Sequence, residues 1–165
     1  MISVELLRRY PFFTGFDHDQ LRALAMATDE HSVDAEHTFF NEEEMLSNFF
    51  LILEGTAALT IKIPDREAEQ SNNNHITGDF VTRDVNVGTL GAGELFGWSA
   101  LIPPHEPTAS IKAMTPCRVV SFDTETLQHT MDEDCAFGHA MTLKVAQIIR
   151  ERLRGRRMEL LTEYA

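Results

Sequence analysis

The segment from residue 91 to residue 113 combines residue types that can bind an anion. It reads GAGELFGWSALIPPHEPTASIKA, with glycines at positions 91, 93 and 97. Glycine adopts backbone conformations that turns and close approaches need, so residues 98–102 are predicted to form one helical turn that ends at Pro103 and Pro104. The first N–H groups of such a turn have no partner inside it and can bind an anion. The segment therefore predicts a phosphate-binding geometry.

This segment resembles the phosphate-binding cassette of the cyclic nucleotide-binding domain family, the ligand modules of catabolite activator proteins, kinase A regulatory subunits and nucleotide-gated channels. The family cassette reads roughly G-x-x-F-G-E-x-A-L, then a loop, then R-[TSA]-A-[TS], and here the two parts read GELFGWSAL and PTAS. The family's glutamate, which holds the ribose 2′-hydroxyl, falls on Trp98, and its arginine, which pairs with the cyclic phosphate, falls on Pro107. The resemblance implies a ligand pocket made by Gly97, Trp98, Ser99, Ala100, Pro107, Thr108 and Ala109.

The two replaced residues predict poor binding of cAMP and cGMP. A charge-assisted hydrogen bond contributes about 1.5 to 3 kcal/mol, so losing both lowers the affinity by roughly two to four decades. Trp98 either fills the pocket, which we favour, or forms a flat wall for a planar ligand. Three alternatives remain open: a genuine cAMP receptor with compensating contacts, a haem or other apolar small-molecule sensor, and an assembly subunit with a filled pocket.

Length and composition predict one domain over residues 1–165. The chain is 43% hydrophobic and 24% charged, which is ordinary globular usage. It has no apolar run long enough to cross a bilayer and no secretory pattern near its start, so a cytoplasmic protein is expected. The two cysteines, Cys117 and Cys135, give no disulfide framework and no cluster site, and no cofactor is expected.

The hydrophobic period predicts a mainly β fold, a double-stranded β-helix (jelly-roll) barrel, with N-terminal helices over 1–30 and C-terminal helices over 124–165. The barrel is placed at 31–123 and includes the cassette at 91–113. The expected strands are 32–35, 38–40, 49–54, 57–63, 79–90, 109–115 and 118–123. Gly55 is expected at a tight hairpin turn with a positive φ. Residues 64–78 are predicted to be a long polar loop.

Helical spacing predicts the flanking elements. A short helix should end at Pro11, and Asp17 should cap an amphipathic helix over 19–29. After a short helix at 124–131, a long one should begin near Asp134 and fray after Gly155. In the family the long helix covers the ligand pocket and pairs in a dimer. We expect a homodimer through an apolar stripe of Phe137, Met141, Val145, Ile148 and Leu153.

Charge argues against nucleic acid as a partner. The formal net charge is −12, and the segment from Lys144 onward is +3, which leaves −15 on the rest. Because phosphate neutralisation dominates nucleic-acid binding, no DNA or RNA partner is expected, and the arginines are read as a solvated or internally docked helix face. The family's DNA-reading helix-turn-helix would begin near residue 155, and no DNA-binding domain is expected. A protein partner remains possible.

No catalytic motif is found in the sequence, so an enzyme is not expected. The seven histidines lie in separate segments without metal-ligand spacing. His31 and His37 across a hairpin, and Ser99 near His105, are weighed as sites, and a structural role is favoured for each. The glycine pattern at 91–97 is not a dinucleotide fingerprint, because prolines end the helix that such a motif would open. The sequence therefore predicts a non-catalytic regulatory or sensor module for signal transduction.

Overall fold

The computed structural model describes residues 1–65 and 82–164. Contacts divide the chain into two compact units. A helical unit joins Met1–Asp29 to Phe122–Ala165, and a β unit comprises Glu30–Ser121. Most of the predicted polar loop at 64–78, and the first residues of the strand expected at 79–90, lie outside the described residues.

The N-terminal part of the helical unit contains α1 (Val4–Leu7), the short 3-10 helix η1 (Pro11–Phe13) and α2 (His18–Met26). Asp17 caps α2 as predicted: its carboxylate accepts a hydrogen bond from the N–H of Gln20 at 2.8 Å, and the Gln20 side chain accepts one from the N–H of Asp17 at 3.1 Å. This reciprocal pair is the capping box. The predicted helix end at residue 29 is wrong, because α2 ends at Met26.

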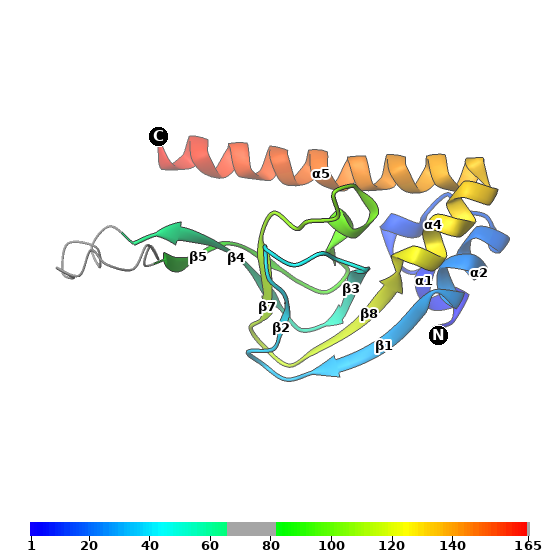
Figure 1. The fold of residues 1–165 in the computed structure, drawn as a ribbon, viewed down its shortest axis with the longest axis horizontal. Coiled ribbons are helices and arrows are strands. Elements are labelled where there is room, and N and C mark those ends of the chain that lie inside the picture. The colour runs from blue at the N-terminus through cyan, green and yellow to red at the C-terminus, as the bar shows by residue number, and fades with distance from the viewer. Residues whose placement is uncertain (66–81, 165) are drawn as a thin grey trace. The chain divides into compact units, whose positions relative to one another are not determined.

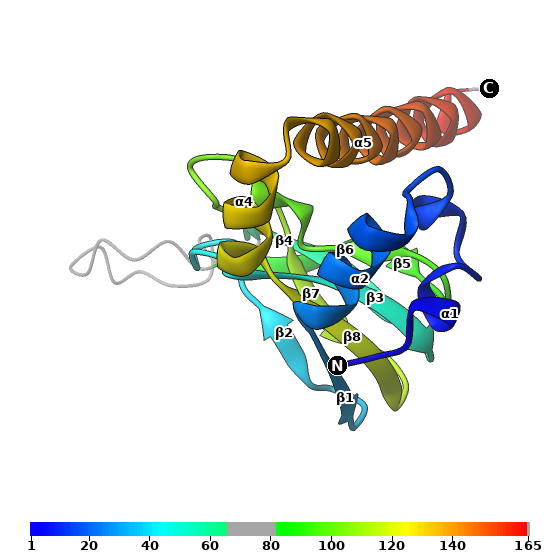
Figure 2. The ribbon, with the colours of Figure 1, turned by 90° about the vertical axis from the view of Figure 1, so that its right-hand side faces the viewer.

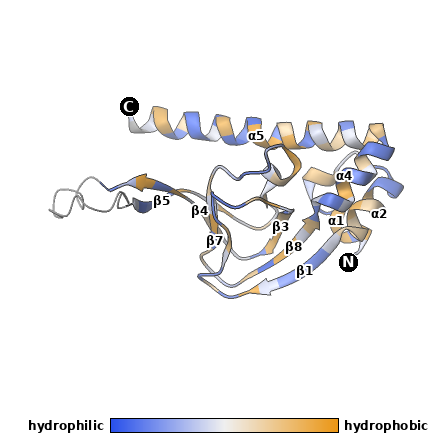
Figure 3. Ribbon diagram, viewed as in Figure 1, coloured by the Kyte–Doolittle hydropathy of each residue, from blue (hydrophilic) through white to orange (hydrophobic). Residues whose placement is uncertain are grey.

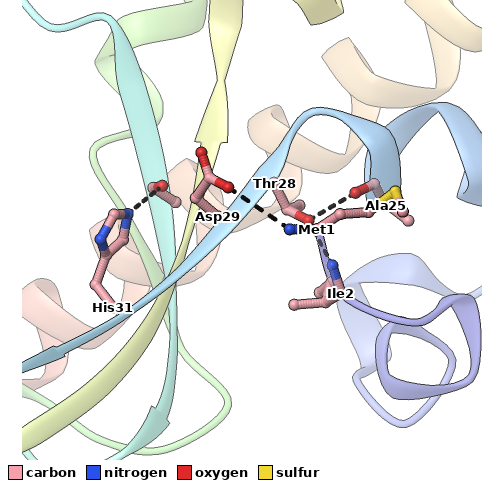
Figure 4. A network of polar contacts seen from close by, with 7 residues as sticks. Met1, Ile2, Ala25, Thr28, Asp29 and His31 are labelled. Atoms are coloured by element: carbon pink, nitrogen blue, oxygen red, sulfur yellow. Dashed lines mark hydrogen bonds and ion pairs between the residues drawn. The ribbon is translucent and has the colours of Figure 1, made fainter.

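The chain passes from α2 into β1 (Thr28–Val33) at Thr28, whose side chain makes two hydrogen bonds at this junction. Its hydroxyl donates to the carbonyl of Ala25 at 2.6 Å and accepts from the backbone N–H of Ile2 at 3.0 Å (Figure 4). The N-terminal ammonium group of Met1 lies 3.5 Å from the carboxylate of Asp29. These contacts attach the start of the chain to the end of α2.

Within the described residues, eight strands form two four-stranded sheets. The first sheet has the order β1-β8-β3-β6 and the second the order β2-β7-β4-β5 (Figures 1 and 2). Their bounds are β1 Thr28–Val33, β2 Thr38–Phe40, β3 Asn48–Glu54, β4 Ala57–Pro64, β5 Thr82–Leu90, β6 Leu95–Phe96, β7 Ser110–Ala113 and β8 Cys117–Asp123. The mainly β fold with flanking helices is confirmed. Strand β6 was not predicted, and β1 begins four residues before the strand expected at 32–35.

The turn at Gly55 has the predicted positive φ, at 94°, but it is not a hairpin between paired strands. It connects β3 in one sheet to β4 in the other. A Cβ on Gly55 would lie 2.4 Å from the carbonyl oxygen of Pro116 and 2.7 Å from the sulfur of Cys117. Glycine is therefore required both for the backbone conformation and for the close approach of β8.

The core of the β unit is formed where inward-facing strand residues meet. The alternation of side chains along each strand brings one face of every strand to this core. Its fully or nearly buried members are Phe40, Ile52, Ala57, Leu90, Phe96, Ile111, Ala113, Cys117 and Val119. Phe39 and Phe50 are partly buried and pack against it.

The C-terminal part of the helical unit contains α4 (Thr124–Glu133) and α5 (Cys135–Glu163). Asp123 and Asp134 cap them through hydrogen bonds from backbone N–H groups, and α5 begins next to Asp134, where the long helix was expected. α5 is one uninterrupted helix that continues past Gly155 to Glu163 (Figure 1), and fraying after Gly155 stays a prediction. Hydrophobic residues recur along its whole length (Figure 3), and they include exposed Leu153, Leu160 and Leu161 near its end.

Candidate functional site

The cassette begins where β5 delivers the chain to a tight turn at Gly91. The carboxylate of Glu94 accepts a hydrogen bond from the N–H of Gly91 at 2.7 Å and closes this turn. Two backbone hydrogen bonds then hold the turn on β3: the N–H of Gly93 donates to Ile52 at 2.8 Å, and the N–H of Ile52 donates to Glu94 at 3.0 Å. The entry to the cassette is therefore held by one side-chain and two backbone hydrogen bonds.

Gly97 places the next segment directly on β3. Its φ is 75°, and a Cβ built on it would lie 3.1 Å from the carbonyl oxygen of Asn48 and 3.3 Å from the ring of Phe40. Both observations confirm that this position needs the backbone freedom of glycine. The short 3-10 helix η2 (Trp98–Leu101) follows, which confirms the predicted helical turn.

The helical turn offers fewer free amides than the sequence suggests. We expected the backbone amides of residues 97–100 to be available to an anion, but the N–H of Ala100 donates to the carbonyl of Gly97 at 3.0 Å. This 3-10 hydrogen bond is formed within the turn itself, so that amide is not available for a ligand. The amides of Trp98 and Ser99 precede it in the turn.

His105 closes the loop after η2, a role that the sequence did not reveal. Its Nδ1 donates to the carbonyl oxygen of Ala100 at 2.8 Å, its N–H donates to Ile102 at 2.8 Å, and its carbonyl accepts from Leu46 at 2.9 Å. Its φ is 66°, an uncommon conformation for a residue with a side chain. Because its Nδ1 is hydrogen-bonded to a carbonyl oxygen, this imidazole stabilises the loop. This geometry fits the structural role that we favoured for His105 over pairing with Ser99.

The residues in the second part of the cassette differ in how far they are buried. Pro107 is buried and Ala109 is partly buried, whereas Thr108 is exposed. Ser110, the last residue of the PTAS segment, is buried, and its hydroxyl accepts a hydrogen bond from the N–H of Glu42 at 3.0 Å. Thr108 therefore keeps its hydroxyl at the surface, while Ser110 holds β7 to the chain before β3.

In the first part of the cassette, Trp98 is partly buried, while Ser99 and Ala100 are 8% and 3% exposed. Residues 91–111 contain no lysine or arginine, and the next cation in the sequence is Lys112. The ammonium group of Lys112 forms a salt bridge with Glu36. Residues 91–111 therefore contribute backbone amides and hydroxyl groups to an anion, but no positively charged side chain.

The residues proposed for the dimer helix do not share one exposed face. Phe137 and Met141 are 0% exposed, and Val145 is 5% exposed. Ile148 is partly buried, and Leu153 is half exposed. Only the later members of the stripe thus present surface to a second copy of the chain.

Within residues 1–65 and 82–164, no group of three or more histidine, cysteine or acidic side chains is placed to hold a metal ion. The same described residues include no helix that combines the length and apolar character needed to cross a bilayer.

The chain matches the family model of the cyclic nucleotide-binding domain over residues 30–134. A candidate cyclic nucleotide-binding protein from Geobacter metallireducens is 29% identical to it, with a TM-score of 0.75 over 93% of this chain and 99% of that one. The catabolite activator protein of Thermus thermophilus shares 18% identity and a TM-score of 0.63, over 93% of this chain and 63% of that one.

The regulatory domain of protein kinase A from Toxoplasma gondii, solved with cAMP, is also similar in fold. It is 18% identical, with a TM-score of 0.58 over 76% of this chain and 42% of that one. No curated protein matches the sequence. The family match covers more than half of the chain and includes the whole cassette, and the chain therefore belongs to the cyclic nucleotide-binding domain family.

Proposed function

We propose that this chain is a non-catalytic regulatory module whose cassette has diverged away from cAMP and cGMP. The observation that carries the proposal is the chemistry of two positions: Trp98 stands where the family has the ribose-binding glutamate, and Pro107 stands where it has the phosphate-binding arginine. The salt bridge between Lys112 and Glu36 adds to it, because the nearest following cation in the sequence is already paired.

The expected loss of affinity is large. Each charge-assisted hydrogen bond contributes about 1.5 to 3 kcal/mol, so two lost bonds remove about 3 to 6 kcal/mol. This corresponds to roughly two to four decades in the dissociation constant, since about 1.4 kcal/mol is a factor of ten. The amides of Trp98 and Ser99 and the hydroxyl of Thr108 supply only neutral donors to an anion.

Isothermal titration calorimetry with cAMP and cGMP at physiological salt tests the proposal. Wild-type protein should show no binding at low micromolar nucleotide, and the double variant Trp98→Glu with Pro107→Arg should gain affinity. The matched control is Trp98→Gln with Pro107→Gln, which changes the same positions without restoring either charge and should gain little. A wild-type dissociation constant near micromolar would reject the proposal.

We further propose that the signal leaves through α5 of a homodimer. Large apolar side chains remain exposed on this helix: Leu143, Leu153, Met158, Leu160 and Leu161 are each at least half exposed. Exposed apolar residues that recur along a helix favour pairing with a second helix. The family resemblance supports this proposal, because it implies that the long helix pairs in a dimer.

A further inference from the structure

The β unit contains a second concave site that shares no residue with the cassette pocket. It is a cleft of about 540 Å³ between β1, β2, β3 and β8. Its volume falls in the range of small-molecule pockets. The side chains that define its chemistry are His31, His37, Phe39, Phe50, Val119 and Ser121. We refer to it as the histidine cleft.

One wall of the histidine cleft is aromatic. The rings of His37 and Phe39 are 5.2 Å apart at 85°, and those of Phe39 and Phe50 are 5.7 Å apart at 53°. Phe96 supports this wall from the core, because it stacks on Phe50 with centroids 5.0 Å apart. Since Phe39 and Phe50 are only partly buried, they keep ring surface available to a ligand.

Hydrogen-bonding groups lie in the same cleft. The Nε2 of His31 lies 2.8 Å from the hydroxyl oxygen of Ser121, which fixes the orientation of the His31 ring (Figure 4). Ser121 is 8% exposed, whereas His31 and His37 are exposed. A neutral imidazole carries one donor and one acceptor, so each ring can accept from or donate to a polar ligand group. The cleft thus combines an aromatic wall with two imidazole groups.

The cleft supplies no fixed cation. No lysine or arginine is among the residues that line it. Its one acidic residue, Glu30, is paired with the Nε of Arg118 at 2.8 Å, and Arg118 also binds Glu54 at 2.7 Å. A phosphate or carboxylate would therefore enter without a counter-ion, in a protein of net charge −12.

We propose that the histidine cleft binds a small uncharged aromatic compound that carries a hydroxyl or a ring N–H, of the class of phenol or indole. The ring packs against Phe39 and Phe50, and the polar group hydrogen-bonds to the imidazole of His31 or His37. This site is independent of the proposed cassette function, because none of the seven cassette residues contributes to it.

The test is a titration of the full chain with phenol and with indole, followed by two-dimensional amide NMR at pH 7.5. We expect saturable binding with shifts concentrated at residues 31–39, 48–50 and 119–121. His31→Leu and His37→Ala should each weaken binding about 3- to 10-fold, as expected for one lost hydrogen bond or ring contact. His139→Leu is the matched control, because His139 is exposed on α5 and should leave the affinity unchanged.

Ligand controls separate the two parts of the proposal. Cyclohexanol, which lacks the ring, and toluene, which lacks the polar group, should both bind more weakly than phenol, and benzoate should not bind. Trp98→Phe should leave phenol binding unchanged, which distinguishes this cleft from the cassette. Absence of saturation in the wild type, equal binding of benzoate, or a loss caused by Trp98→Phe and not by the two histidine variants would overturn the proposal.

Discussion

The Nδ1 of His105 donates a hydrogen bond to the carbonyl oxygen of Ala100 at 2.8 Å, and this contact connects the cassette loop to its helical turn without a ligand. The backbone of His105 makes two further hydrogen bonds, to Ile102 and from Leu46. The loop in this protein therefore depends on internal contacts for its shape.

Replacing the His105 side chain should destabilise the protein. His105→Ala removes the hydrogen bond to Ala100 and should lower the free energy of unfolding by about 1 kcal/mol, the net contribution of a typical hydrogen bond. Urea unfolding followed by circular dichroism measures the change. His139→Ala is the control, because His139 is exposed on a helix, and it should change stability by less than about 0.5 kcal/mol. Equal effects of the two variants would show that the contact contributes nothing.

Two glycine positions should respond to alanine in opposite directions. Gly97→Ala should destabilise by about 1 to 3 kcal/mol, because φ is 75° and the new methyl group would lie 3.1 Å from the Asn48 carbonyl oxygen. Gly155→Ala should stabilise by about 0.5 to 1 kcal/mol, because it lies within α5 with no atom within 4 Å of the added Cβ. Thermal unfolding of both variants measures the contrast, and a destabilising Gly155→Ala would contradict the continuous helix.

Removing the hydroxyl group of Thr28 should lower the free energy of unfolding. Thr28→Val keeps the shape but leaves the N–H of Ile2 without its acceptor and the carbonyl of Ala25 without this donor. Leaving a buried polar group unpaired costs about 1 to 3 kcal/mol. Chemical denaturation gives the value, and Thr14→Val, at an exposed position, is the control. If both variants unfold at the same denaturant concentration as wild type, the hydrogen bonds of Thr28 do not contribute to stability.

Dimerisation through α5 should be broken at its exposed end. Leu153 and Leu160 are 52% and 54% exposed and stand seven residues apart, which places them on one helical face. Leu153→Glu and Leu160→Glu should give monomers by light scattering at tens of micromolar. Thr14→Glu adds the same charge at an exposed position outside α5 and should remain dimeric.

Wild-type protein that is monomeric under these conditions would rule the proposed dimer out. Met141 is not a useful probe, because it is 0% exposed and a glutamate there would unfold the chain rather than separate subunits.

Local chemistry was enough to predict many elements from the sequence. The cap at Asp17 involves a hydrogen bond from a backbone group three residues away. Positive φ angles at Gly55 and Gly97 follow from the turn residues themselves. The cassette motif identified the family because GELFGWSAL and the TAS residues of PTAS keep the family's pattern within one short segment.

Elements that depend on partners distant in the sequence were missed or misplaced. Strand β6 has only two residues and exists because Leu95 and Phe96 pair with β3, so no periodicity could reveal it. The turn at Gly55 looks like a hairpin from its residues, yet β3 and β4 enter different sheets because each pairs with strands far along the chain. Strand pairing is a long-range property, and a local pattern cannot specify it.

The sequence by itself determined the fold family and the two replaced cassette positions, because both follow from residue types within about twenty positions of one another. Only the tertiary structure decided that His31, from β1, bonds to Ser121 of β8, ninety residues later, and that His37, Phe39 and Phe50 line the same cleft. It also decided which apolar residues of α5 are buried. Each of these outcomes depends on which segments pack together, and that packing is settled by the whole chain rather than by any one stretch of it.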